Sequence, residues 1–451
     1  MSGPTRFKHQ IAGTKYLLEN KKCLLADSPG LGKTAQVIDM ITQAKVRRSL
    51  IVVPNQLKSD WVKALEVFSS GTRVEVVKGP YLERARVLRE GKPGVVILNY
   101  ELLYKHSEDI LEGNFNLVAF DEAHKLKNRN AQVTRGAKRV GKKVGRVVFI
   151  TGTPLTKSVV DLFPLLNIIL PKEFSSYWKF VNRYCFRVFN GFGYTIVDRK
   201  EDDPALQELR GILAQYMLRR TTDQVFPDFV DLHVFTKIID TSEGQRKIYQ
   251  DLKKSMLAQV GGTELLVVNA VSLMTRLKQV LLDPELAVGP VEVLQGAKVE
   301  ALLDILADLS GSQLVVFTQF ASAIRPLITR LAEHGYSAVE YSGQVSDTVA
   351  NDNEAKWKAG EAQVLVSGID KGGIGKTWTQ ARYAVMLDKK WLPYENEQAR
   401  KRLHRIGQEH PVVVWEFLTK DTLEEKIEKV LSERQNLIEG VITRAMLEAL
   451  L

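Results

Sequence analysis

The chain has 451 residues, 45% hydrophobic and 26% charged, which is typical of a folded globular protein with room for roughly two to four domains. Its 63 Lys and Arg against 53 Asp and Glu give a net charge of +10, which suits a polyanionic partner and equally a merely soluble basic protein. Two cysteines and scattered histidines exclude a disulfide framework and a zinc-ligand pattern, so we expect no structural zinc. The polar, basic start of the chain predicts no signal peptide. No apolar run approaches the roughly 18 residues that cross a bilayer, so we expect no membrane partner.

Short apolar runs alternate with helical patterns in the first third of the chain. The runs are rich in Val, Ile and Leu and are bounded by polar residues, Gly or Pro, as buried parallel strands are. The predicted strands are Cys23–Ala26, Leu50–Val53, Val95–Leu98, Leu117–Phe120 and Val147–Ile150. This alternation predicts a parallel α/β lobe.

A glycine-rich loop follows the first predicted strand and leads into an amphipathic helix. It reads DSPGLGKT over residues 27–34, with Asp27 where the strict phosphate-loop pattern has its first glycine. Glycines let backbone N–H groups and the helix N-terminus face a phosphate, while Lys33 reaches the β- and γ-phosphates and the Thr34 hydroxyl holds Mg²⁺. We therefore expect ATP to bind at Pro29, Gly30, Leu31, Gly32, Lys33 and Thr34.

Two acids end the fourth predicted strand, in the string Asp121-Glu122-Ala123-His124. An ordinary helix start could also carry acids, because negative charge is favourable at a helix N-terminus. A strand tip downstream of a phosphate loop favours catalysis instead, since such an acid holds Mg²⁺ and its neighbour orients water. We therefore predict that Asp121 binds Mg²⁺ and that Glu122 orients the attacking water.

The middle of the chain, from about Lys157 to Asp283, has a helical and aromatic pattern. We interpret the strings FSSYWKFVNRYCF and LKKSMLAQV as parts of helical protrusions on both lobes, flanking a hinge near Val230–Ile239. The strand–helix rhythm then returns and predicts a second parallel lobe. Its predicted strands are Leu314–Phe317, Ala338–Tyr341, Val364–Ser367, Ala384–Leu387 and Val412–Phe417.

A dense basic segment, QARKRLHRIGQ at residues 398–408, follows these strands and is predicted to start a helix. Arg402 and Arg405 lie three residues apart, hence on one helical face. Arginine can stabilise charge on a transferring phosphoryl group, although such a run is often only a solvated basic face. Its position at the end of the second lobe favours a role in sensing ATP.

Two basic clusters indicate a nucleic-acid partner. Lys125 to Arg146 contains nine basic residues and no acids, and begins at the acidic catalytic string, so we expect its charge beside the active site. Lys376 to Arg405 contains eight basic residues against three acids. A lone charge run is usually solvated. Two runs next to the predicted nucleotide-binding and arginine segments favour phosphate contacts, which do not read sequence.

Together these strings resemble helicase superfamily two, and within it the Swi/Snf-type chromatin-remodelling ATPases. The matching strings, in order, are HQIAGTKYLL, DSPGLGKT, LIVVPNQLKSDW, VVILNYELL, FDEAHKLKN, ITGTPL, QYMLRR, VVFTQF, GGIGKT and QARKRLHRIGQ. The resemblance covers nearly the whole chain, and it suggests a minimal bacterial or phage member.

The resemblance implies an α/β fold of two RecA-like parallel-sheet lobes with helical protrusions inserted between them. The implied boundaries are a first ATP-binding lobe at 1–156, a helical insertion and hinge at 157–235, a second protrusion at 236–290, a second lobe at 291–420 and bracing helices at 421–451. It also implies ATP hydrolysis in the cleft between the lobes, with duplex DNA bound across both.

The resemblance assigns further roles. Gln10 would contact adenine, and Arg402 and Arg405 would be arginine fingers beside the catalytic residues Lys33, Asp121 and Glu122. Coupling of hydrolysis to DNA grip would involve His124, Thr151, Thr153 and Gln398. The expected DNA contacts are Lys127, Asn128, Lys142, Lys143, Thr318, Gln319, Gly373, Lys376 and Trp391.

Several strings depart from the family pattern. Residues 372–377 read GGIGKT where GGxGLNL is usual, which looks like a second phosphate loop; we favour a DNA-facing loop whose Lys376 touches a phosphate. Asn351 lies where an arginine is common, and Trp391-Leu392-Pro393 replaces Trp-Asn-Pro. These changes concern coupling and DNA contact more than the reaction.

We thus expect an ATP- and Mg²⁺-dependent motor that translocates on double-stranded DNA without separating strands. An unwinding helicase acting on DNA or RNA stays open, and would need a strand-splitting pin. An ATP-gated DNA clamp with little turnover is the alternative from another class. We expect a monomer in a bacterial or phage-infected cytoplasm, with single-stranded nucleic acid and a protein loading factor as further partners.

Overall fold

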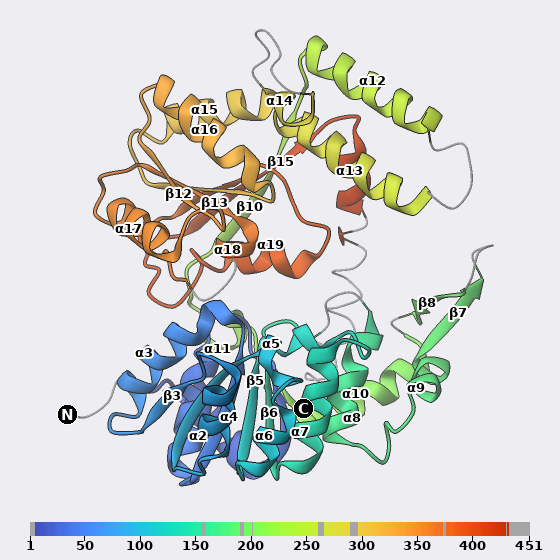
Figure 1. Ribbon diagram of the computed structural model, residues 1–451. Coiled ribbons are helices and arrows are strands. Elements are labelled where there is room, and N and C mark those ends of the chain that lie inside the picture. The colour runs from blue at the N-terminus through green and yellow to red at the C-terminus, as the bar shows by residue number, and fades with distance from the viewer. Residues whose placement is uncertain are drawn as a thin grey trace. The chain divides into compact units, whose positions relative to one another are not determined.

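The computed structural model describes residues 5–154, 158–189, 194–200, 202–259, 266–288, 296–372, 376–429 and 431–432. The described chain divides into two units, the first ending at Phe229 and the second beginning at Val230. Each unit is built on its own parallel sheet, so the predicted pair of α/β lobes is confirmed. Figure 1 labels the elements of both.

The first sheet has the strand order β3-β4-β2-β5-β6-β1-β9, and every neighbouring pair is parallel. Its strands are β1 (Lys22–Leu25), β2 (Arg48–Val53), β3 (Val74–Val76), β4 (Gly94–Asn99), β5 (Leu117–Asp121), β6 (Arg146–Ile150) and β9 (Met217–Leu218). All residues of β2 and β5 are buried, as expected where helices cover both faces of a parallel sheet. The five predicted strands are found, with ends shifted by one or two residues.

Helices connect these strands and continue beyond them. They are α1 (Lys8–Glu19), α2 (Lys33–Gln43), α3 (Lys58–Phe68), α4 (Tyr81–Arg89), α5 (Tyr100–Leu103), α6 (Ser107–Glu112), α7 (Gln132–Lys143), α8 (Phe163–Ile169), α9 (Tyr177–Tyr184), α10 (Pro204–Tyr216) and α11 (Thr222–Val225), with the short 3-10 turns η1 (Asn55–Leu57), η2 (Ala123–Leu126) and η3 (Val159–Leu162). One apolar cluster joins the central strands to α8, α9 and α10, so the first half of the predicted insertion packs on the first lobe.

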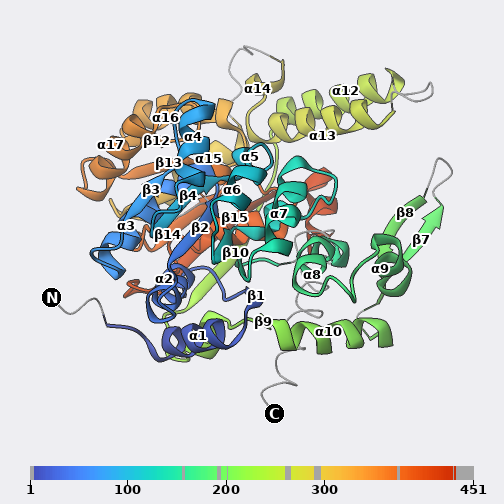
Figure 2. The same cartoon turned by 60° about the horizontal axis from the view of Figure 1, so that its bottom comes forward.

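We expect a helical insertion from the sequence, but the structure shows that the insertion is not wholly helical. After α9, an antiparallel hairpin forms from β7 (Cys185–Phe189) and β8 (Tyr194–Asp198). Aromatic and β-branched residues favour strands, but from the sequence we interpret this aromatic stretch as helical. Figures 1 and 2 both show the hairpin projecting beyond α9 from the first unit.

The second sheet has the order β10-β15-β14-β11-β13-β12, again all parallel. Its strands are β10 (Leu232–Ile239), β11 (Leu314–Thr318), β12 (Ala338–Tyr341), β13 (Val364–Gly368), β14 (Tyr383–Met386) and β15 (Val412–Thr419). The boundary between the two units falls at the start of the predicted hinge near Val230–Ile239, but most of that segment is strand, since β10 pairs with β15 along its full length. Its run of exposed residues at the sheet edge conceals the strand from a search for buried runs.

Helices of the second unit are α12 (Glu243–Gln259), α13 (Leu266–Leu282), α14 (Glu285–Val288), α15 (Ala297–Asp308), α16 (Ala321–Glu333), α17 (Asp347–Lys358), α18 (Ile369–Gly372) and α19 (Pro393–Arg400). Helices α12 and α13 lie side by side as the predicted second protrusion (Figures 1 and 2). Alternate residues of β11 enter two different apolar clusters, Leu314 and Val316 on one face and Val315 and Phe317 on the other. Both faces of this sheet are therefore covered.

The predicted bracing helices at 421–451 lie mostly outside the described residues. Within the part that the structure describes, residues 423–429 are helical. No helix in the described part of the chain has the length and apolar character needed to cross a membrane.

Candidate active site

The predicted phosphate loop lies at the carboxyl end of β1, between that strand and α2. Gly30 and Gly32 have φ of 93° and 74°, a backbone region that glycine enters without a Cβ clash. A Cβ on Gly32 would lie 2.3 Å from Nε2 of Gln10, which packs directly on the loop. The predicted adenine-contacting residue therefore sits against the loop, with its Oε1 accepting a hydrogen bond from the Phe7 N–H at 3.2 Å.

Lys33 and Thr34 open α2, so the free N–H groups of that helix start face the loop. Lys33 Nζ donates to the carbonyl oxygens of Asp27 and Ser28, at 2.7 and 3.2 Å. An ammonium turned into a loop lined by helix N–H groups is suited to a phosphate. These residues fit the nucleotide that the sequence predicts.

Asp27, which departs from the phosphate-loop pattern, is fully buried and has a charged partner. Arg220 donates to its carboxylate from Nε at 3.0 Å and from Nη2 at 2.5 Å. Gln36 of α2 donates to the same carboxylate at 3.1 Å, and Arg220 Nη1 donates to the His9 carbonyl at 2.5 Å. This cluster ties the loop to α1, α2 and the residues after β9.

Asp121 ends β5 and is held by three contacts. The Trp61 indole N–H donates to its Oδ2 at 2.7 Å, the Glu122 N–H donates to its Oδ1 at 2.9 Å, and the Tyr100 hydroxyl donates to its carbonyl at 2.6 Å. Burial and the neighbouring Glu122 raise the pKa of Asp121 to about 6, while Trp61 and Lys33 oppose that rise. Burial thus disfavours the ionised form of Asp121, and a cation beside the carboxylate would stabilise that form.

Glu122 has a left-handed backbone, with φ of 51°, a region that non-glycine residues enter at a cost of about 1–2 kcal/mol. The Nδ1 atom of His124 lies 3.2 Å from its carboxylate and also 3.2 Å from the Thr151 hydroxyl oxygen. That hydroxyl oxygen accepts a hydrogen bond from the Thr153 N–H at 3.1 Å. The structure thus joins the predicted water-orienting acid to three of the four predicted coupling residues.

The loop after β6 also touches the phosphate loop. A Cβ on Gly152, between the two coupling threonines, would lie 2.8 Å from the Pro29 ring. Arg219 Nη1 donates to the Gly152 carbonyl at 3.4 Å. Since Arg220 holds Asp27, the adjacent arginines 219 and 220 contact the loops after β6 and β1 respectively.

Thr34 and Asp121 supply one hydroxyl and one carboxylate for the predicted Mg²⁺. Within the described ranges, no group of three or more His, Cys, Asp or Glu side chains could hold a metal ion by itself. Magnesium at nucleotide sites commonly keeps waters and binds one or two protein oxygens with substrate phosphates. The donors present fit that mode.

Arg402 and Arg405 meet, although not on a helix. The predicted helix start is wrong, because α19 ends at Arg400 and residues 401–410 form turns. The Trp378 N–H binds the Arg402 carbonyl at 2.9 Å, and this tertiary bond captures backbone that a helix would need. Both guanidinium groups donate to the Lys376 carbonyl, at 2.8 and 3.3 Å. Gln398 lies buried in α19, before the turn.

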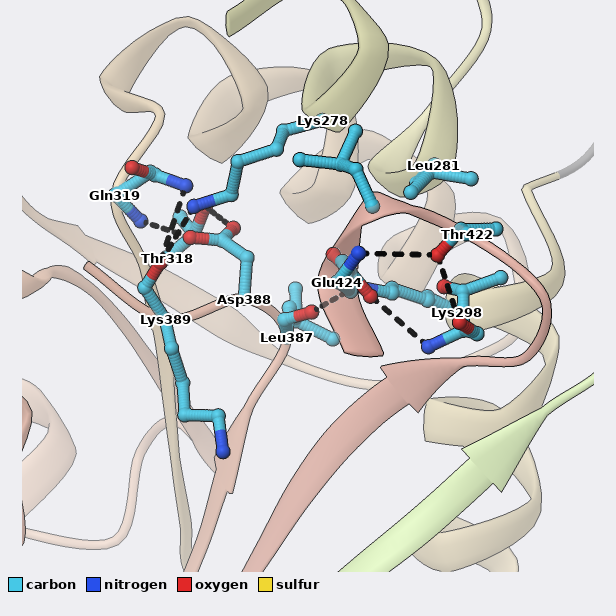
Figure 3. Close-up of polar contacts among 12 residues, drawn as sticks. Lys278, Leu281, Lys298, Thr318, Gln319, Leu387, Asp388, Lys389, Thr422 and Glu424 are labelled. Atoms are coloured by element: carbon cyan, nitrogen blue, oxygen red, sulfur yellow. Dashed lines mark hydrogen bonds and ion pairs between the residues drawn. The ribbon is translucent and has the colours of Figure 1, made fainter. Parts of the chain in front are cut away.

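Two predicted DNA contacts, Thr318 and Gln319, lie beside Asp388 at the carboxyl ends of β11 and β14 (Figure 3), and a third, Trp391, contacts the nearby Lys278. Asp388 accepts a bond from the Thr318 hydroxyl at 2.6 Å and from the Gln319 N–H at 2.8 Å. Lys278 donates to the Lys389 carbonyl at 2.5 Å, and its ammonium lies 5.6 Å from the centre of the Trp391 ring. Thr318 is fully buried, whereas Trp391 is 37% exposed.

Lys298 and Glu424 form the buried support of this cluster. Lys298 Nζ donates to the Glu424 carboxylate at 2.7 and 2.9 Å and to the Leu387 carbonyl at 2.7 Å (Figure 3). The pair fixes the end of β14, immediately before Asp388.

Lys376 is held within the second unit. Its Nζ lies 2.9 Å from the side-chain oxygens of both Glu354 and Asn351. The carbonyl of Lys376 receives Arg402, so this residue links α17 to the arginine turn. Gly373, a further predicted DNA contact, lies outside the described residues.

The basic run at 125–146 does not stay at one place. Lys127 and Asn128 follow η2, near the predicted catalytic acids. From there α7 runs toward the amino ends of the strands, over about 18 Å for a helix of its length. Lys22, which begins β1, donates to the Gly141 carbonyl at 2.9 Å. Lys142 and Lys143 therefore lie at the amino edge, and the expectation that the whole run lies beside the active site is wrong.

Sequence reasoning missed Trp61, Arg219 and Arg220. Trp61 and the two arginines fall in the strings LIVVPNQLKSDW and QYMLRR, in which no local pattern indicates a role for these side chains. Their partners lie 60, 67 and 193 positions away in sequence.

A family model for the SNF2-related domain matches residues 9–286, and one for the helicase conserved C-terminal domain matches residues 297–407. A Mycoplasma genitalium protein named as an uncharacterized ATP-dependent helicase is 27% identical, over 96% of this chain and 42% of its own length. The ISWI chromatin-remodeling complex ATPase of Saccharomyces cerevisiae is 24% identical, over 96% of this chain and 40% of its own. This chain thus spans about two fifths of the length of these relatives.

A solved structure, the Sulfolobus solfataricus SWI2/SNF2 ATPase core in complex with dsDNA, matches with a TM-score of 0.48 and 23% identity. The match covers 98% of this chain and 94% of that one.

Proposed function

The chain belongs to the SNF2-related family, and from that premise we propose that it is an ATP hydrolase that translocates on double-stranded DNA. The observation that carries the proposal is the convergence of Lys33, Asp121, Glu122 and Thr151 at one edge of the first sheet. Ligands of open parallel sheets bind at the carboxyl ends of the strands. The names of the relatives, ATP-dependent helicase and remodeling ATPase, support the same reaction class.

ATP binding rests on the phosphate loop. Backbone N–H groups at the start of α2 and the Lys33 ammonium would bind the β- and γ-phosphates. Thr34 and Asp121 would hold Mg²⁺, which neutralises charge on the phosphates when bound. The 2.7 Å hydrogen bond from Trp61 would hold the Asp121 carboxylate in one orientation for that role.

Hydrolysis needs a water in line with the γ-phosphate, and Glu122 is the residue we assign to orient it. Its backbone strain turns the carboxylate toward His124. His124 and Thr151 then connect that carboxylate to the loop carrying Thr153. We propose that this chain of contacts transmits the state of the catalytic acid to a DNA-gripping loop.

Other roles rest on the family alone. We assign Arg402 and Arg405 as arginine fingers, with the shared Lys376 carbonyl holding both in one turn. We assign DNA contact to Lys127, Asn128, Gln319, Lys376 and Trp391. Phosphate contacts of this kind would make binding nonspecific and salt-sensitive.

A true unwinding helicase is the second candidate, and the projecting β7–β8 hairpin is the feature that favours it. An ATP-gated clamp is disfavoured, because a clamp has no need to keep Lys33, Asp121 and Glu122 together in contact geometry.

Steady-state ATP hydrolysis tests the proposal, measured without nucleic acid and with single-stranded DNA, duplex DNA and RNA. Lys33→Ala is the blank, and Lys63→Ala, an exposed lysine of α3, is the matched control. Strong stimulation by duplex, followed by displacement of a third strand from a triplex, supports the translocase. Stimulation mainly by single strands or RNA replaces it with the unwinding helicase, and no turnover with any nucleic acid replaces it with the clamp.

A further inference from the structure

The β7–β8 hairpin and Trp178 of α9 expose an unusual amount of apolar surface. We call these residues the aromatic hairpin. Its exposed large side chains are Trp178, Phe186, Val188, Phe189, Tyr194 and Val197, and Phe189 and Tyr194 are more than 60% exposed. By strand register, Phe189 and Tyr194 lie on one face of the ribbon, whereas Phe186, Val188 and Val197 lie on the other. Exposed apolar surface that is rimmed by polar residues often marks a binding site.

The base of the aromatic hairpin is firmly attached to the first unit. Cys185 is buried, and Asp198, its cross-strand partner, accepts hydrogen bonds from the Ser158 hydroxyl at 2.7 Å and the Val159 N–H at 3.0 Å. From there the two strands project past α9 (Figures 1 and 2). A two-stranded ribbon is only marginally stable in water by itself, so this anchoring holds its exposed side chains in place.

Planar groups stack along one side of the ribbon. The Arg187 guanidinium lies 5.1 Å from the Trp178 ring centre and 4.6 Å from that of Tyr194. Tyr194 meets Phe189 edge to face, with ring centres 5.4 Å apart. On the other side, Arg199 lies 4.4 Å over the Phe186 ring. Rings and guanidinium planes of this kind are the surfaces on which unpaired bases stack.

The charge of this segment suits a polyanion. Residues 177–200 contain five basic residues, Lys179, Arg183, Arg187, Arg199 and Lys200, against one acid, the anchored Asp198. Arg183 and Arg199 are paired with Glu208 and Asp203 beyond the hairpin. Among the described residues, no carboxylate lies within ion-pair distance of Arg187, whose charge is therefore available to a phosphate.

We propose that the aromatic hairpin binds single-stranded DNA beside the duplex on which the motor runs. A duplex hides the faces of its bases, so a patch built from π-faces and arginines matches unpaired bases better than paired ones. The inference rests on the proposed function for its DNA partner. It adds the structure on which the motor engages, a junction between duplex and single strand.

Equilibrium binding to labelled DNA tests the inference, with a blunt duplex and the same duplex carrying a single-stranded thymidine extension as probes. The full chain should bind the extended duplex more tightly. Phe189→Ser with Tyr194→Ser should lose about tenfold in affinity for the extended probe and little for the blunt one, since stacking of one base contributes about that factor. Arg187→Gln should lose less, and Phe235→Ser, an exposed aromatic of β10, should change neither.

Unchanged affinity of the double variant for the extended probe, with wild-type thermal melting, would overturn the inference and leave the patch to a protein partner. An equal loss for both probes would also overturn it, because the hairpin would then be a general duplex contact. The motor is judged separately, by stimulation of wild-type ATP hydrolysis with the blunt duplex. If the chain prefers the extended duplex but duplex does not stimulate its ATP hydrolysis, the proposed translocase is wrong and the proposed single-strand binding by the aromatic hairpin stands.

Discussion

Arg220 closes a bidentate ion pair on Asp27, the residue that departs from the phosphate-loop pattern. Its Nε and Nη2 atoms lie 3.0 and 2.5 Å from the two carboxylate oxygens, and Asp27 has no exposed surface. The departure is therefore balanced by an arginine 193 positions later, at the end of the insertion. A buried carboxylate left without its cation is costly, so each residue constrains the other.

Arg220→Ala should lower the free energy of unfolding by about 3 kcal/mol and weaken ATP binding, because it strands the Asp27 carboxylate in the protein interior. Adding Asp27→Asn should recover part of both losses. Chemical denaturation and nucleotide titration of the four proteins in a double-mutant cycle measure the coupling. Arg47→Ala, an exposed arginine of the same unit, is the control; strictly additive effects would contradict the pairing.

Ten of the thirteen strands in the two sheets could be predicted, because they are short apolar runs, several of them buried on both faces, as in Leu50–Val53 and Val364–Ser367. The short edge strands β3 and β9 were not predicted. The acids at the tip of β5 were likewise predictable, since Asp121 directly follows such a run. Strand β10 was not predicted, because its exposed residues lack that pattern of burial. Contacts between residues far apart in the sequence were not predicted either. They are Trp61 to Asp121, Arg220 to Asp27, and the hydrogen bond from the Trp378 N–H to the Arg402 carbonyl, where the chain is not helical. No local sequence period encodes these.

Glu122→Gln should abolish turnover while ATP and DNA still bind. The amide keeps the size of the side chain but cannot polarise the attacking water as a carboxylate does. Single-turnover hydrolysis and DNA-binding measurements with ATP present test this. Glu112→Gln, an exposed acid of α6, is the control, and substantial turnover in Glu122→Gln would assign the water to another residue.

Thr151→Val should leave basal hydrolysis nearly intact and reduce its stimulation by duplex DNA by about tenfold, which corresponds to the net contribution of about one hydrogen bond. The hydroxyl is the only atom replaced, and it joins His124 to the loop of Thr153. Thr134→Val removes a comparable buried hydroxyl, which donates to the Leu126 carbonyl at 3.1 Å, and should leave stimulation unchanged. Equal stimulation in both variants would argue against the coupling chain.

Arg405→Ala should lower turnover by about 10³-fold with little change in ATP affinity, as removal of an arginine finger does. Arg405→Lys should restore little, because lysine lacks the planar fork of donors. Arg402→Ala should resemble Arg405→Ala, since both groups share the Lys376 carbonyl. The kcat and KM of each variant, measured with saturating duplex, test this; retained turnover in Arg405→Ala would assign the finger elsewhere.

Glu416 should give the second unit a stability that depends on acid pH. It accepts Arg400 at 2.5 Å and Lys389 at 2.9 Å. Burial opposes its ionisation, but the two cations outweigh burial and hold the pKa of Glu416 below its ordinary value. A depressed carboxylate pKa adds stability above the unfolded pKa, and that stability is lost as pH falls through the folded value.

Glu416→Gln should therefore destabilise the chain by about 2 kcal/mol near neutral pH, because it leaves two cations with only an amide. The difference from wild type should shrink as pH falls from about 5 to about 3, where wild-type Glu416 is itself neutral. Denaturation at a series of pH values measures this difference directly. Glu361→Gln, an exposed acid after α17, corrects for general charge effects. A difference that stayed constant down to the lowest pH would show that the ion pairs with Arg400 and Lys389 contribute no stability.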